Sequence, residues 1–338
     1  MKKKIRLFVF WILIALFTIF VIFSITKLQN VVEVLRTAKI YWILLAAFLQ
    51  LLYFISYSYM YKFSFRIAGI DERVKNFFPV LLSSLFVNVV APIGGVTGSV
   101  FLVDESARKG ESASKATVGV MGAMLSEFLS FGILLIISIF YLFRRGSLKT
   151  YELAGSLGIL FVIILIISFM ILGMWHPGKL HKVFHFFQKA VNKVSMTLRN
   201  TTYLADNWSY EHSSDFSIAV KSFTNLKKVL LPIFIAFIGH FLSYLSIFIL
   251  FLAFSMRVGP GVLLAGYSMG MLFKIVSPVP QGIGVVETIM VLVFTSLGVS
   301  GNVAAVVAVS YRGLTFWIPL LIGFALFYTN KSFRLKHE

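Results

Sequence analysis

Four ionisable residues lie inside strongly apolar stretches of this chain and are the side chains best placed to do chemistry: Glu127, Lys274, Glu287 and Arg312. Such a group costs roughly 3 kcal/mol or more at the centre of a bilayer, so it usually faces a partner or a water-filled cavity. We predict that Glu127 and Arg312 face each other or a common polar cavity that admits a charged substrate. The alternative is an ion pair that only holds the helices together.

Weaker polar signals surround these charges. Lys274 and Glu287 flank an interruption rich in glycine and proline and can both reach a polar cavity, although Lys274 can instead extend to a membrane interface. Asn88 precedes another such interruption, where it can satisfy free backbone groups or contact another helix. His240 stands alone in FIGHFLSY, which favours a hydrogen bond to a neighbouring helix over proton transfer.

The composition indicates a membrane protein. Hydrophobic residues make up 59% of the 338 residues and charged residues 13%, against about 45–50% and about 25% in ordinary globular domains. The formal net charge of +18 would suggest nucleic acid in a soluble protein, but here it first serves to set topology and meet anionic lipid headgroups. The chain has no cysteine, which excludes disulfides, thiol catalysis and cysteine-ligated zinc.

Several apolar runs are long enough to cross a bilayer, which takes about 20 residues. Residues 7–24 follow the basic MKKKIR, and we interpret them as an uncleaved first span rather than a signal peptide, because the run is long and no A-x-A cleavage site follows. The further predicted spans are 40–60, 117–143, 154–174, 229–255 and 303–329.

Two apolar stretches, 77–103 and 260–298, are interrupted in the middle. Proline removes a backbone donor and clashes with the preceding turn, so an unbroken helix through either site is disfavoured. We predict two re-entrant hairpins of half-helices; the alternative is a pair of kinked full spans. The residues at the two tips are Pro92, Gly94, Gly95, Pro278, Pro280, Gly282 and Gly284.

Basic residues predict the orientation. The N-terminal MKKKIR, the 61–77 loop, the 175–228 segment and the C-terminal NKSFRLKHE all carry an excess of lysine and arginine. The positive-inside rule places them in the cytoplasm, with both termini, in a multi-pass protein of the cell membrane. Arg144, Arg145 and Lys149 are exceptions, in a short external turn.

The two halves have the same order of parts in opposite orientation: span, interrupted hairpin, span. The predicted fold is therefore an all-α polytopic bundle whose oppositely oriented hairpins are related as an inverted repeat, the pattern of many transporters. We divide the chain into a first membrane half at 1–174, a basic linker at 175–228 and a second membrane half at 229–338.

The linker contains a predicted amphipathic helix. Apolar residues recur at helical spacing through KLHKVFHFFQKAVNKVSMTL, with lysines largely between them. Such a helix is typical of the anionic membrane surface. His181 and His185 are four residues apart but lack a third ligand, so we predict no metal site and no cofactor.

The sequence resembles the flippase-like membrane family that includes the transmembrane part of lysylphosphatidylglycerol synthases. The resemblance runs from about residue 40 to residue 329. It rests on two clusters of residues. The first is Asn88, Pro92, Gly94, Gly95 and Gly98 with Glu127; the second is Pro278, Pro280, Gly282, Gly284 and Glu287, followed by Tyr311, Arg312, Trp317, Pro319 and Gly323.

The resemblance implies a lipid translocase whose substrate pathway runs past these residues, together with Lys274. The implied cargoes are aminoacyl-phosphatidylglycerol, a glycolipid or a polyprenyl-linked sugar, and the implied roles are in lipid metabolism and cationic peptide resistance. In full-length lysylphosphatidylglycerol synthases a soluble C-terminal domain transfers lysine. This chain ends nine residues after the last predicted span, so we expect that activity only with a partner protein.

Other functions remain open from the sequence. A membrane subunit could present lipid to a separate synthase or glycosyltransferase without transporting it, with the basic linker as its docking surface. A small-solute permease fits less well, because its polar residues would be dispersed through the spans. Enzymatic chemistry is the weaker class, since no phosphate-binding loop, metalloprotease motif, nucleophile elbow or dinucleotide fingerprint is present.

Overall fold

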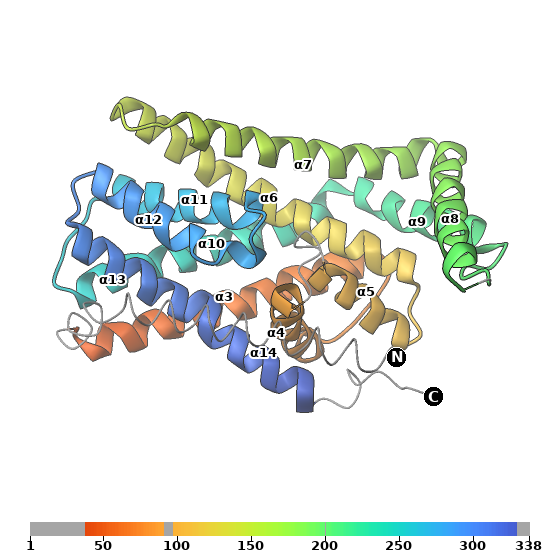
Figure 1. Ribbon diagram of the computed structural model, residues 1–338, viewed down its shortest axis with the longest axis horizontal. Coiled ribbons are helices and arrows are strands. Elements are labelled where there is room, and N and C mark those ends of the chain that lie inside the picture. The colour runs from red at the N-terminus through yellow and green to blue at the C-terminus, as the bar shows by residue number, and fades with distance from the viewer. Residues whose placement is uncertain (1–37, 91–96, 200, 330–338) are drawn as a thin grey trace.

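The computed structural model describes residues 38–90, 97–199 and 201–329. All regular secondary structure in these residues is helical (Figure 1). The helices are α3 (Ile40–Ile67), α4 (Val74–Val90), α5 (Thr97–Arg108), α6 (Ala113–Arg144), α7 (Thr150–Trp175), α8 (Pro177–Arg199), α9 (Trp208–Lys221), α10 (Leu226–Ala253), α11 (Pro260–Val276), α12 (Val285–Ser296), α13 (Gly301–Arg312) and α14 (Ile318–Thr329). The predicted first span at 7–24 lies outside the described residues.

Five helical segments are long and apolar enough to cross a membrane: α3, α6, α7, α10 and the continuous stretch from α13 to α14. They match the five predicted spans that fall in the described part of the chain. Four of them extend beyond the predicted bounds, whereas α10 begins three residues earlier than predicted and ends at Ala253, two residues before the predicted end at 255. The prediction of an all-helical polytopic membrane protein is confirmed at this level.

The centre of the molecule is the antiparallel pair α3 and α10. The Ser56 hydroxyl donates to the backbone carbonyl of Ile235 (2.9 Å), and the Gln50 side chain lies between Ser243 and Ser246 and donates to both. Small residues allow helix backbones to approach closely, and serine hydroxyls can then bond across the interface. The close pairing of these two helices therefore follows from small polar residues within apolar sequence.

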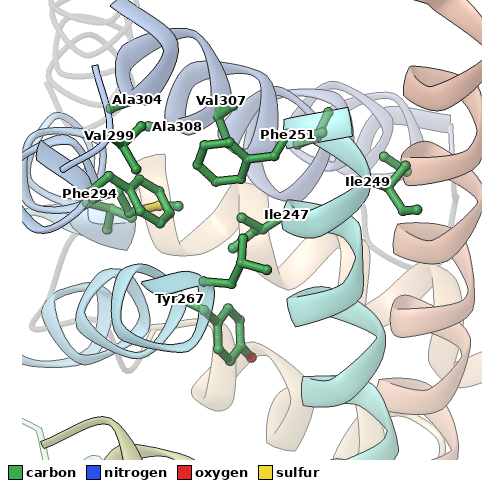
Figure 2. Close-up of a cluster of buried hydrophobic side chains, with 14 residues drawn as sticks. Ile247, Ile249, Phe251, Tyr267, Phe294, Val299, Ala304, Val307 and Ala308 are labelled. Atoms are coloured by element: carbon green, nitrogen blue, oxygen red, sulfur yellow. The ribbon is translucent and has the colours of Figure 1, made fainter. Parts of the chain in front are cut away.

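Helices α11 and α12 form a hairpin packed side by side. A Cβ on Gly266 would lie 2.1 Å from the Phe294 ring, and one on Gly270 would lie 2.8 Å from Met290. Figure 2 shows this hairpin against α10 and α13, with the rings of Phe251 and Phe294 among the buried side chains. These two rings meet edge to face at 5.1 Å. At these two glycines the side chains of Phe294 and Met290 from α12 therefore pack directly against the backbone of α11.

Helices α4 and α5 form the corresponding pair in the first half. The Asn88 Oδ1 atom accepts a hydrogen bond from the backbone N–H of Gly98 at 2.6 Å and so joins the two helices. A Cβ on Gly98 would lie 2.5 Å from the Asn88 side chain, so a larger residue would displace it. The predicted tip residues Pro92, Gly94 and Gly95 lie outside the described residues.

Helix α8 confirms the helix predicted in the linker. It lies at one end of the molecule and runs across the direction of α7 (Figure 1). Only part of its apolar side is free, because Phe184 packs on Trp208 and Phe216 of α9. Phe186 and Phe187 remain exposed. The linker therefore builds a two-helix layer against the ends of α6 and α7.

Candidate functional site

The turn between α11 and α12 is the centre of the candidate site. Pro278 and Pro280 cannot donate backbone hydrogen bonds, and Gln281, Gly282 and Gly284 have positive φ values of 53°, 62° and 77°. A Cβ on Gly282 would lie 2.6 Å from Val286 and 3.1 Å from the Cα atom of Lys274. The turn thus depends on glycine for its backbone and places Gln281 in a conformation uncommon for side-chain-bearing residues.

Arg312 holds this turn. Its Nε atom donates to Glu287 Oε1 at 3.0 Å, and its Nη2 atom donates to the backbone carbonyl of Gln281 at 3.0 Å. The guanidinium also lies over the Phe316 ring, 4.5 Å from its centre. Side-chain exposure is 3% for Arg312 and 19% for Glu287. Arg312 therefore ties α13 to both the turn and the first turn of α12.

This geometry contradicts one of the two predicted arrangements, in which Glu127 and Arg312 face each other directly. Arg312 pairs with Glu287, and no ion pair between Arg312 and Glu127 is found in the described part of the chain. The reason is packing: α12 and α13 are sequential neighbours in contact, so Glu287 reaches Arg312 across one interface. The Oε2 atom of Glu287 is buried without a hydrogen-bond partner among the described residues.

The backbone after Arg312 departs from the α-helix. Residues Gly313–Trp317 form a π-helical turn before α14. Pro319 follows two residues later. Because proline lacks an N–H and crowds the preceding turn, a regular α-helix through this position would lose a backbone hydrogen bond. Wide π turns of this kind occur often at functional sites. Here the turn places Phe316 beneath the Arg312 guanidinium.

Glu127 lies in a separate polar group formed by α3, α6, α10 and α11. The Tyr57 hydroxyl donates to Glu127 Oε2 at 3.2 Å. His240 Nε2 lies 3.3 Å from the Glu127 backbone carbonyl, and His240 Nδ1 lies 2.7 Å from the Tyr267 hydroxyl. Since a carbonyl only accepts, Nε2 carries the proton and Nδ1 accepts from Tyr267. The predicted bonding of His240 to neighbouring helices is confirmed.

Lys274 lies between the two groups. It is seven residues after Tyr267 on α11, which puts both side chains on one helix face. The charges of Glu127 and Arg312 both act on its ammonium, yet no described residue forms a hydrogen bond or ion pair with it. Its side chain is only partly covered by protein. The charges of Glu127 and Arg312 therefore both act on Lys274, although no hydrogen bond or ion pair between any two of these three side chains is found among the described residues.

Tyr311 connects this centre to the α3–α10 pair. Its hydroxyl lies 2.8 Å from Ser243 Oγ, which also accepts from the Gln50 amide at 3.2 Å. Tyr57, Tyr267, Ser243 and Gln50 were not predicted as site residues. The available signal was the spacing of tyrosines at 53, 57 and 61, which places three hydroxyl groups along one face of an otherwise apolar span.

A small cavity borders the polar centre. It is lined by Tyr53, Tyr57, Met60, Glu127, Ile235, Ala236, Gly239 and His240. It lies beside the α3–α10 contact, where Gly239 leaves room next to Tyr53. Glu127 is therefore a buried residue that borders a small internal space.

A second cavity lies away from these charges, at the base of the α4–α5 pair, and Glu72, Glu105 and Lys109 are among its lining residues. Burial raises the pKa of the Glu72 carboxyl, but a hydrogen bond from Asn76 and the nearby Lys109 ammonium together hold that pKa below its ordinary value. Among the described residues, no three His, Cys, Asp or Glu side chains gather as a metal site requires. We therefore place the candidate site at the Glu127–Lys274–Arg312 centre.

The spans, the hairpin and the buried charges define a multi-pass helical membrane protein. Residues 8–323 match the family described as the lysylphosphatidylglycerol synthase TM region, and the chain belongs to that family. Among its relatives is a UPF0104 membrane protein of Methanocaldococcus jannaschii, 26% identical over 96% of this chain and 95% of the relative. A UPF0104 membrane protein of Methanothermobacter thermautotrophicus is 22% identical over 87% of this chain and 86% of the relative. The predicted family resemblance is thus confirmed.

Proposed function

We propose that the protein is a lipid translocase, which passes a polar headgroup between leaflets while the acyl chains stay in the bilayer. The observation that carries this proposal is a charged centre, buried among membrane spans, at the tip of a short helical hairpin. Neither arm of the hairpin is long enough to cross. At 1.5 Å per residue α11 is about 26 Å long and α12 about 18 Å, against a hydrocarbon core of about 30 Å.

The order and contacts of the helices support the proposed inverted repeat, and with it transport. Helices α3 to α6 correspond in order to α10, α11, α12 and the α13–α14 span. Under this correspondence each contact among helices α3 to α6 has a counterpart in the second half. The pairs are α3–α4 with α10–α11, α4–α5 with α11–α12, α5–α6 with α12–α13, and α3–α6 with α10–α13. Between the halves, the contact of α4 with α14 has its counterpart in the contact of α11 with α6. Helix α4 also contacts the tip of the second hairpin. Broken helices from two inverted halves meet in this way at transporter substrate sites.

The same arrangement supports a cytoplasmic placement of the basic segments. The α3–α4 loop, helices α8 and α9, and the end of α14 lie toward one end of the molecule (Figure 1). The exceptional Arg144 and Arg145, at the other end, lie over the rings of Phe140 and Tyr141 at 5.1 and 5.6 Å. Aromatic contact stabilises cations at a membrane interface. We propose a cell-membrane location on this basis.

Site-directed labelling tests the re-entrant hairpin, because the natural chain contains no cysteine. Gly259→Cys and Ser300→Cys lie just before α11 and α13, at exposed positions. We expect an impermeant maleimide to label both from the same side of the membrane as Ser147→Cys. The Thr224→Cys variant should be labelled only from the other side. Labelling of positions 259 and 300 from opposite sides would instead indicate one kinked span.

Transport itself is tested in vesicles that contain phosphatidylglycerol with a quenchable fluorescent label. We expect the purified protein to expose inner-leaflet label far faster than protein-free vesicles do. Lys274→Met should slow this exposure by at least about tenfold, because a charged hydrogen-bond donor is lost. Lys221→Met, an exposed lysine at the end of α9, is the control and should transport as wild type does.

The outcomes separate the functions. Fast transport by the purified protein excludes a subunit that only presents lipid to a separate synthase or glycosyltransferase. If the protein binds lipid but leaves the label in its original leaflet, that presenting role replaces the translocase. Equal rates for Lys274→Met and Lys221→Met would remove Lys274 from the pathway.

A further inference from the structure

We propose that Lys274 binds the phosphate of an anionic lipid headgroup and that Glu127 is the internal anion which this phosphate displaces. The inference rests on the proposed translocase and names its substrate class. It follows from how the two buried cations differ in their surroundings, although the sequence places both beside the same hairpin.

Arg312 is already held by contacts within the protein. Its guanidinium is 3% exposed, it donates to Glu287 and to the Gln281 carbonyl, and one face covers the Phe316 ring. A phosphate could reach it only by breaking contacts that fix the turn. The geometry therefore assigns Arg312 to the structure of the tip and not to the cargo.

The Lys274 ammonium, in contrast to the Arg312 guanidinium, is not held by protein contacts in the described residues. The ammonium has no hydrogen-bond or ion-pair partner among them, and the Lys274 side chain is only half-buried. An ammonium at membrane depth is costly without a counter-charge. The two charges that act on it are the attraction of Glu127 and the repulsion of Arg312, so the position favours an additional anion close to Lys274.

The Glu127 carboxylate can act as the counter-charge of the Lys274 ammonium when no cargo is bound. When cargo arrives, the headgroup phosphate can take its place. Its carboxylate retains the Tyr57 hydroxyl as a donor and borders the cavity between α3, α6 and α10. A headgroup phosphate is a stronger partner for the ammonium, since it offers several acceptor oxygens at once. Competition between carboxylate and phosphate would keep binding weak enough for release on the other side.

Binding is measured on detergent-solubilised protein by calorimetry with three probes: short-chain phosphatidylglycerol, inorganic phosphate and a short-chain glycolipid without phosphate. We expect phosphatidylglycerol to bind best. Lys274→Met should weaken its binding by about tenfold to a hundredfold, and Lys274→Arg should retain most of it. Glu127→Gln should bind it more tightly than wild type, because the internal competitor is neutral. Lys221→Met serves as the unchanged control.

Several outcomes would overturn the inference: wild-type affinity in Lys274→Met, weaker binding in Glu127→Gln, or equal binding of the phosphate-free glycolipid. Equal affinity for inorganic phosphate would overturn the lipid assignment. Folding is checked separately by thermal unfolding, where Lys274→Met should stay close to wild type, because no described residue forms a hydrogen bond or ion pair with the Lys274 ammonium. Loss of stability in that variant would make Lys274 a structural partner of Glu127 and contradict the proposal.

The inference and the proposed function can fail independently. If Lys274→Met binds normally while the wild type moves lipid, the phosphate site is wrong and the translocase stands. If binding depends on Lys274 but the wild type moves no lipid, the site stands and the translocase is wrong.

Discussion

Arg312→Met is expected to lower the free energy of unfolding by about 3–5 kcal/mol, the usual cost of removing one partner from a buried ion pair. The substitution leaves Glu287 as a mostly buried charge and removes the donor to the Gln281 carbonyl. The turn between α11 and α12 would lose its link to α13. Denaturant unfolding in detergent measures the change.

Two variants accompany this measurement. Arg257→Met, at an exposed arginine between α10 and α11, should change the free energy of unfolding by less than about 0.5 kcal/mol. Arg312→Met combined with Glu287→Met should recover most of the loss, because an apolar pair of similar volume can replace a buried ion pair. If Arg312→Met and Arg257→Met unfold at the same denaturant concentration, the ion pair does not hold the turn.

Gly323→Ala is expected to destabilise the protein by about 3 kcal/mol, at the upper end of the usual range for overpacking. A Cβ at this position would lie 2.1 Å from the backbone carbonyl oxygen of Leu82. Backbone cannot move aside as a side chain can, so α14 would have to separate from α4. That contact holds the α4–α5 pair against the last span, and its loss should also reduce transport.

Gly132→Ala is the matched control, since it makes the same chemical change inside a membrane span. Apart from the helix's own backbone and the chain neighbours of Gly132, no atom of residues 38–90, 97–199 and 201–329 lies within 4 Å of a Cβ at this position, and alanine favours the helix over glycine by up to about 1 kcal/mol. We expect Gly132→Ala to be neutral or stabilising in thermal unfolding. Equal destabilisation of both variants would mean that the α4–α14 contact is not responsible.

Much of the fold followed from the sequence because the bilayer leaves few choices. Long apolar runs must become helices there, since unpaired backbone groups are too costly. This argument located the spans at α3, α6, α7, α10 and α13–α14. Proline and glycine likewise marked the turn at 277–284, which the structure builds from two proline residues and three positive φ angles.

The pairing of the charges did not follow from the sequence. The burial of both charges in apolar spans suggested that Glu127 and Arg312 meet or share a polar cavity, but burial alone does not say which helix faces are in contact. Glu287 is the partner because α12 packs against α13 and directs its first turn toward Arg312. The tyrosine hydroxyls around Glu127 were missed for a similar reason: a tyrosine in an apolar span packs like phenylalanine until its neighbours are known.

The sequence by itself determined the membrane class, the positions of the described spans and the interrupted hairpin at 260–298. These depend on local composition, which fixes whether a segment enters lipid and where a helix must stop. Only the tertiary structure decided that Arg312 serves the turn while Lys274 has no hydrogen-bond or ion-pair partner in the part of the chain that the structure describes. That distinction depends on which helix faces meet, and a side chain's partners are set by packing across several helices rather than by its neighbours along the chain.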